Sequence, residues 1–169
     1  MKRERLSFLE EWHKGSSRKP LVMRGARQVG KTWLVRKFAE TENLELIEIN
    51  FEHHPNLATL FSSNDPAEIL LLLEARFNKS INPKKSLLFL DEIQVFPELL
   101  AKLRWFAEDM PELALIAAGS LLEFVLKKHT FSMPVGRITY MHLEPLSFDE
   151  FLMAQGHIPL LHYLDAYTL

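Results

Sequence analysis

The residues with the clearest chemical capacity lie between Gly25 and Thr32, where the sequence reads GARQVGKT. This segment satisfies the pattern G-x-x-x-x-G-K-[ST], and each fixed position has a physical reason. The two glycines permit a tight turn and close approach, so that successive backbone N–H groups can surround phosphate oxygens. Lys31 supplies a positive charge between the outer phosphates, and the Thr32 hydroxyl is a ligand for Mg²⁺. The segment therefore predicts a site for a phosphorylated ligand and magnesium.

The sequence around this segment supports the same interpretation, because it lies between an apolar run and an amphipathic run. We assign the segment and the residue after it to nucleotide binding: Gly25, Ala26, Arg27, Gln28, Val29, Gly30, Lys31, Thr32 and Trp33. The backbone does most of the binding in such a loop, so the side chains of Arg27 and Gln28 can point in any direction.

Two carboxylates, Asp91 and Glu92, follow the apolar run 87–90. In an open α/β sheet, ligands bind at the carboxyl ends of the strands. We assign Asp91 to the magnesium ion, and Glu92 to the general base that polarises an attacking water. The alternative is that this acidic pair only begins a turn.

Two polar residues further along the chain complete the predicted catalytic set of Lys31, Glu92, Ser120 and Arg137. Ser120 ends the next apolar run, where a polar side chain can sense the terminal phosphate or cap the helix that follows. Arg137 can contact phosphate charge, in its own subunit or in a neighbour's. Its alternative role is that of a solvated loop arginine.

Apolar and amphipathic segments alternate along the chain and predict the elements that hold these residues. Strands are expected at 20–24, 44–51, 86–90, 113–118 and 137–143. Helices are expected at 1–15, 31–42, 55–82 (in two pieces broken at 64–66), 97–110, 121–128, 147–155 and 163–169. This alternation predicts a three-layer α/β domain with a mainly parallel sheet.

Composition narrows the function classes further. A chain of 169 residues with a net charge of −2 has no global basic field to support nonspecific nucleic-acid binding. The absence of cysteine excludes disulfides and thiolate zinc sites, and the seven histidines show no zinc-binding spacing. The apolar runs, such as 69–73 and 87–90, are far too short to cross a bilayer. We expect a soluble, cytoplasmic protein that does not enter the membrane.

Five segments together resemble a known family: RGARQVGKTWLVRKFA, INFE, LLFLDEIQVFP, LIAAGSLLEF and PVGRITYMHLEPLSFDEF. From roughly Leu21 to Phe151, the sequence is similar to prokaryotic AAA-type P-loop ATPases, and also to archaeal-type and signalling-switch ATPases. The resemblance implies a five-stranded sheet of the additional-strand (51432) type, with one strand inserted between the phosphate-loop strand and the Asp-Glu strand. It also implies ATP as the ligand, Mg²⁺, Walker A and Walker B roles for the two motifs, and a sensor role for Ser120.

Members of this family usually continue into a C-terminal domain of uncertain function. We therefore interpret residues 1–156 as the P-loop ATPase domain and 157–169 as the start of a truncated C-terminal segment, with the effector domain missing.

The leading functional hypothesis is an ATPase whose hydrolysis drives or resets a conformational switch. A nucleotide-binding signalling or DNA-associated module with negligible intrinsic turnover is the alternative, and it would need an arginine from a neighbouring subunit. A small-molecule kinase is less favoured, because the segment 130–137 is short and carries one arginine. We expect ATP as a partner, together with nucleotide-dependent self-association.

Overall fold

The computed structural model describes residues 3–120, Leu122 and 134–166. Its five strands are β1 (Leu21–Arg24), β2 (Glu45–Asn50), β3 (Ser86–Asp91), β4 (Ala114–Gly119) and β5 (Thr139–His142). They form one sheet of order β2-β3-β4-β1-β5, and every pair is parallel. Read from the other edge, this is the predicted 51432 order. The inserted strand is β4, which lies between β1 and β3.

Burial along the strands follows their place in the sheet. Every residue of β3 and β4 is buried, as expected for central strands covered on both faces. In β2 only Ile47 and Ile49 are buried, which fits the predicted position at an edge. The other edge is formed by β5, where Met141 alone is buried.

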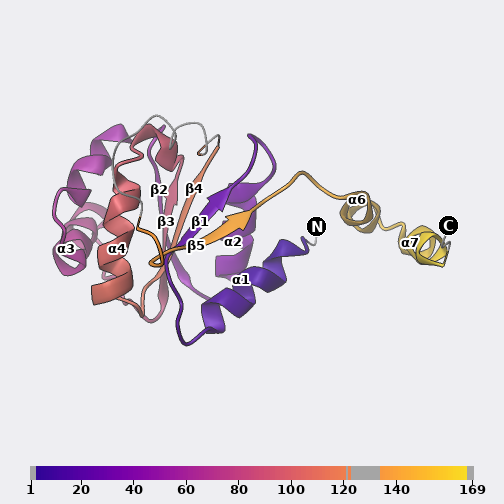
Figure 1. Ribbon diagram of the computed structural model, residues 1–169, viewed down its shortest axis with the longest axis horizontal. Helices are drawn as coiled ribbons and strands as arrows, with labels where there is room; N and C mark the ends of the chain where they lie inside the picture. The colour runs from indigo at the N-terminus through magenta and orange to yellow at the C-terminus, as the bar shows by residue number, and fades with distance from the viewer. Residues whose placement is uncertain (1–2, 121, 123–133, 167–169) are drawn as a thin grey trace.

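Helices cover both faces of the sheet and form the predicted three layers (Figure 1). One face carries α1 (Arg5–Lys14) and α2 (Lys31–Thr41), and the other carries η1 (Pro55–Phe61), α3 (Pro66–Phe77) and α4 (Leu99–Asp109). A short turn, η2 (Ile93–Val95), follows β3. Two further helices, α6 (Phe148–Ala154) and α7 (Ile158–Asp165), project beyond the sheet.

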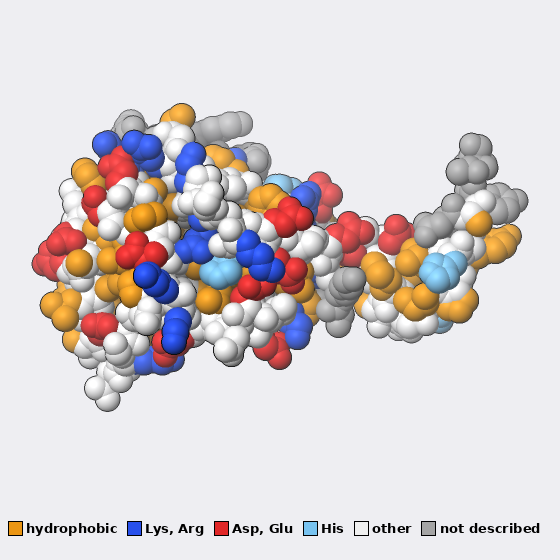
Figure 2. All heavy atoms as spheres, turned by 90° about the horizontal axis from the view of Figure 1, so that it is seen from below, with side chains coloured by type: hydrophobic (Ala, Val, Ile, Leu, Met, Phe, Trp, Pro, Cys, Tyr) orange, Lys and Arg blue, Asp and Glu red, His pale blue; other side chains and the backbone are white. Residues whose placement is uncertain are grey.

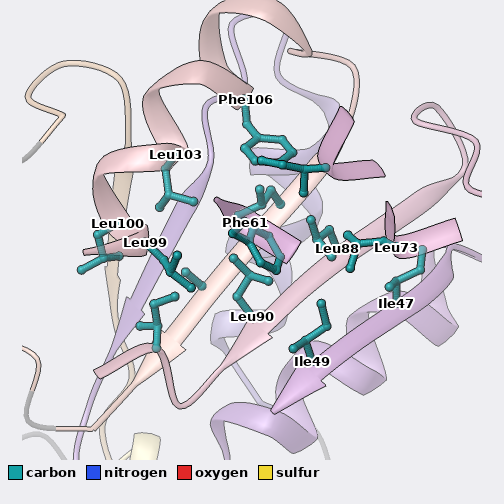
Figure 3. Packing of buried hydrophobic residues seen from close by; sticks show 14 of the residues in the cluster. Ile47, Ile49, Phe61, Leu73, Leu88, Leu90, Leu99, Leu100, Leu103 and Phe106 are labelled. Atoms are coloured by element: carbon teal, nitrogen blue, oxygen red, sulfur yellow. The ribbon is translucent and has the colours of Figure 1, made fainter. Parts of the chain in front are cut away.

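Two hydrophobic cores fill the spaces between these layers, and β3 contributes to both. Leu88 and Leu90 pack under α4, where Leu99, Leu103 and Phe106 cover them (Figure 3). The alternate residues of the strand belong to the second core, with α1 and α2. This division follows from the alternation of side chains along a strand, and it holds the carboxyl end of β3 rigidly between two layers.

Helix boundaries agree closely with the sequence where a capping residue is present. Asp65 caps α3 by accepting a hydrogen bond from the Ala67 backbone N–H at 2.8 Å, which confirms the predicted break. Ser147 caps α6 with a complete capping box. The last helix begins at Ile158, earlier than predicted, because Pro159 is tolerated in a first helical turn. The short helix predicted after Ser120, to residue 128, falls mostly outside the described residues.

The surface of the main body mixes charges of both signs, whereas apolar side chains gather on the projecting helices (Figure 2). The most exposed of them on α6 and α7 are Phe148 and Tyr163, each 62% exposed. Within the described part of the chain, none of the helices has the length and apolar character needed to cross a membrane.

Candidate functional site

The loop between β1 and α2 has a backbone that only glycine can adopt at two positions. Gly25 has a φ of +152°, and a Cβ placed on it would lie 2.2 Å from the Leu143 carbonyl oxygen. Gly30 has a φ of +93° and forms the N-cap of α2. The two glycines of the motif therefore set the shape of the loop, as the sequence predicted.

The first turn of α2 faces this loop. Its first intrahelical hydrogen bond runs from Leu34 N–H to the Gly30 carbonyl at 2.9 Å. The amides of Lys31 and Thr32 come before that bond, so they have no carbonyl acceptor within the helix. Together with the partial positive charge at the helix N-terminus, they form an anion-binding end.

Lys31 is folded back over the loop. Its side chain is buried, and Nζ donates hydrogen bonds to the carbonyls of Gly25, at 3.1 Å, and Ala26, at 2.7 Å. Burial lowers the pKa of Lys31, and the charges of Glu92 and Asp91 oppose that shift. An incoming phosphate would stabilise the protonated ammonium and offer it acceptors of full negative charge.

Asp91 joins the acidic strand end to the phosphate loop. Its Oδ2 accepts a hydrogen bond from the Thr32 hydroxyl at 2.8 Å, and its Oδ1 accepts one from the Glu92 backbone N–H at 3.0 Å. The residue is 2% exposed, and burial raises the pKa of its carboxyl group, while the Thr32 hydrogen bond opposes the rise.

The Thr32 hydroxyl and the Asp91 carboxylate fit the coordination chemistry of magnesium. No group of three or more His, Asp or Glu side chains in the described residues could hold a metal ion alone. Magnesium needs no such cage, because it is held by one or two protein oxygens, waters and substrate phosphates. The Thr32 hydroxyl and the Asp91 carboxylate, joined by a hydrogen bond, would offer hard oxygen ligands beside the N-terminus of α2. Their role as magnesium ligands stays a prediction.

Glu92 follows with a left-handed backbone at φ 54°, which turns the chain sharply after the strand. Its carboxylate accepts a hydrogen bond from the side-chain amide of Gln94. Gln94 in turn lies over Gly119, where an added Cβ would be 2.5 Å from the amide oxygen. Sequence reasoning missed Gln94, because a lone glutamine in a turn carries no motif.

A polar cavity of about 420 Å³ opens in front of these groups. Thr32, Asp91 and Glu92 lie on its wall, with Asn50 from the end of β2. The ends of two neighbouring strands, β2 and β3, and the N-terminus of α2 therefore border a space large enough for a phosphate chain.

Comparison with known protein families decides the identity of this arrangement. The family described as "AAA domain" matches residues 17–152, which is most of the chain. The chain belongs to the AAA domain family. A comparison with curated proteins gave no match. The predicted AAA-type P-loop domain is thus confirmed, and the Gly25–Thr32 segment lies within a nucleotide-binding P-loop fold.

Other residues predicted for the site of this AAA domain occupy varied places. Ser120 is buried directly after β4, at the carboxyl ends of the strands, where the loop and the acidic pair also lie. The helix that it would cap lies outside the described residues, so both of its predicted roles stay open. Trp33 packs its side chain against the core with α1 and α2. Arg27 forms an exposed ion pair with Glu52 at 2.9 Å.

Arg137 lies at the amino-terminal ends of the strands, away from the phosphate loop. Thr139 pairs with Leu21, the first residue of β1, whereas the phosphate loop follows the last residue of that strand. Arg137 comes before Thr139 and forms an ion pair with Glu108 of α4 at 2.8 Å. This position argues against the predicted contact with phosphate in the same subunit. A contact with a neighbouring subunit stays a prediction.

A second cavity, of about 350 Å³, lies beside the loop of the AAA domain. Its lining includes Val29, Pro145 and Leu146, together with Arg3 and Arg27. Nothing in the sequence predicted this cavity, because its walls come from the N-terminus, the loop and the segment after β5.

Proposed function

We propose that this AAA domain binds ATP with Mg²⁺ and hydrolyses it, and that hydrolysis drives or resets a conformational switch. The observation that carries the proposal is the 2.8 Å hydrogen bond between Thr32 of the phosphate loop and buried Asp91, with Glu92 next in sequence. Phosphate binding, metal binding and a candidate base therefore meet at one point of the sheet edge.

Binding begins with the phosphates. The free amides at the start of α2 take the phosphate oxygens, and Lys31 exchanges its loop carbonyls for the outer phosphates. Thr32 and Asp91 would hold Mg²⁺, which supplies neutralisation of the charge on the bridging and terminal oxygens. Asp91 takes part as the ionised carboxylate, so binding displaces any proton that it carries in the free protein.

Hydrolysis then requires a positioned water. Glu92 accepts a proton from this water as its oxygen attacks the terminal phosphorus, and the bond to the bridging oxygen breaks, releasing ADP and phosphate. Gln94 holds the Glu92 carboxylate in one orientation through its amide hydrogen bond. Lys31 stabilises the negative charge that develops on the outer oxygens.

The second cavity could hold the purine base of the nucleotide. Val29, Pro145 and Leu146 give it apolar walls next to the loop, and about 350 Å³ accommodates a purine ring. The base and the phosphates then lie on two sides of the same loop.

A phosphate-release assay without an added acceptor tests the activity. We expect slow, magnesium-dependent release by the wild-type chain. Lys31→Ala should abolish tight binding, because the outer phosphates lose their cation. Glu92→Gln should retain ATP and slow hydrolysis by at least about 100-fold, since general-base catalysis contributes 10²–10⁴-fold.

Unchanged turnover in Glu92→Gln would remove Glu92 as the base. Phosphorylation of an added small molecule in place of phosphate release would favour a kinase instead. The position of Arg137 favours a second candidate, a binding module that turns over only when another copy supplies an arginine. In that case the rate per molecule should rise with protein concentration.

A further inference from the structure

Arg3 is a buried arginine ahead of α1, and the proposed chemistry does not use it. Its side chain is 5% exposed and meets three parts of the chain. The guanidinium donates to the Val29 carbonyl at 3.2 Å and to the Glu144 carbonyl at 2.7 Å, and its Nε lies 3.1 Å from Glu150 Oε1. One side chain thus links the phosphate loop, the segment after β5, and α6.

Glu150, the partner of Arg3, is equally buried and is fixed by the start of α6. Its Oε1 accepts a hydrogen bond from the Glu4 N–H at 2.9 Å, and its Oε2 accepts one from the Ser147 N–H at 3.0 Å. The Ser147 hydroxyl accepts the Glu150 N–H in return, at 3.1 Å. Removal of either charge would leave the other buried without its counter-ion, so the pair resists separation.

The contact with Val29 bears directly on phosphate binding. In a trans peptide the carbonyl of one residue and the N–H of the next point in opposite directions. Arg3 holds the Val29 carbonyl on its own side, so the Gly30 N–H points to the other side of the loop. The guanidinium lies close beside this peptide, since Nη1 is 4.0 Å from an ideal Cβ on Gly30.

We propose that Arg3 is a positioning residue for phosphate binding and that its ion pair with Glu150 couples nucleotide binding to the docking of α6. The inference rests on the proposed nucleotide site. A ligand that requires this orientation of the Gly30 amide stabilises the Arg3 contacts, and these contacts hold the start of α6. Coupling of this kind is reciprocal, so docked α6 must also strengthen nucleotide binding.

Binding of two probes to the full 169-residue chain tests the positioning role. The probes are ADP and inorganic tripolyphosphate, each with Mg²⁺, and the temperature is kept well below the unfolding midpoint of every variant. We expect Arg3→Gln to weaken both probes about tenfold, the effect of losing a charged hydrogen bond. Arg5→Gln is the matched control and should change neither affinity, because Arg5 is exposed.

Two probes are needed because Arg3 also lines the proposed base cavity. A loss of ADP affinity without loss of tripolyphosphate affinity would mean that Arg3 contacts the purine base, and would overturn the positioning role. Unchanged affinity for both probes would overturn it as well. If wild-type protein binds neither probe, the proposed function itself fails, which is a different result from wild-type binding with an indifferent Arg3→Gln variant.

Glu150→Gln tests the coupling without removing the helix cap, since glutamine also serves in a capping box. We expect several-fold weaker binding of both probes, and a double variant with Arg3→Gln no weaker than Arg3→Gln alone. In hydrogen exchange, ADP should slow the amides of α6 in wild type but not in Glu150→Gln. Additive losses of affinity in the double variant, or hydrogen exchange in wild-type α6 that does not change when ADP binds, would contradict the coupling.

Discussion

At the scale of single residues, the site combines groups that are costly to bury. Asp91 is 2% exposed and Lys31 is 7% exposed, and burial acts against the charged form of each. In the free protein these charges are met by hydrogen bonds from Thr32 and to loop carbonyls. Residues arranged in this way reduce the stability of the empty protein and gain stabilisation when the ligand arrives.

Asp91→Asn should therefore stabilise the nucleotide-free protein near neutral pH. Because burial raises the pKa of Asp91, the folded protein binds a proton there more tightly than the unfolded chain does. This stabilisation is fully present below the ordinary value of 3.8 and is lost as pH rises through the folded value. The stability advantage of the variant should grow over that interval and then level off. Urea unfolding with EDTA, from pH 4 to pH 8, measures it.

Asp109→Asn provides the control, because Asp109 is exposed at the end of α4. Its effect on the free energy of unfolding should not follow the same rise with pH. If the free energy of unfolding of wild type increased relative to that of Asp91→Asn as pH rises, the destabilising effect of the buried charge would be contradicted.

At the scale of elements, the phosphate loop is shaped by β5 as well as by its own residues. Leu143 follows β5, donates its N–H to the Arg24 carbonyl at 2.7 Å, and places its own carbonyl against Gly25. This contact joins residues more than a hundred positions apart. It explains why the first glycine of the motif admits no side chain here.

Gly25→Ala should disrupt both the fold and the nucleotide site. The added Cβ would lie 2.2 Å from a backbone oxygen, and overpacking together with a positive φ costs about 3 kcal/mol or more. Gly136→Ala is the matched control, because Gly136 also has a positive φ but has no atom within 4 Å of the new Cβ.

We expect the control to lose only about 1 kcal/mol. Thermal or urea unfolding of both variants gives the comparison, and an equal loss in the two would show that the Leu143 contact does not shape the loop.

The same scale shows what the sequence could predict. The central position of β3 and β4 and the caps at Asp65 and Ser147 were predictable from periodicity and capping, which are local signals. The sheet order was predicted only through the family resemblance, because strand order is not a local signal. The contacts of Arg3 and Gln94 were not, since each depends on which segments the fold brings together. The position of Arg137 could not be predicted for the same reason, because it depends on strand register.

At the scale of the whole molecule, the carboxyl ends of β1, β3 and β4 bring the phosphate loop, the acidic pair and Ser120 to one edge. The projecting helices α6 and α7 are tied to that edge through Arg3 and Glu150. Under the proposed coupling, the state of the nucleotide would be transmitted through Arg3 and Glu150 to the segment that follows the sheet. The proposed switch would use this connection.

The most direct test of the central claim is the affinity for ATP measured with and without Mg²⁺, in wild type and in Thr32→Val. Magnesium should strengthen ATP binding at least about tenfold in wild type, because Thr32 and Asp91 complete its oxygen ligands. Thr32→Val should keep the metal-free affinity and lose the enhancement. Equal affinities with and without magnesium in wild type, or full enhancement in Thr32→Val, would contradict the account.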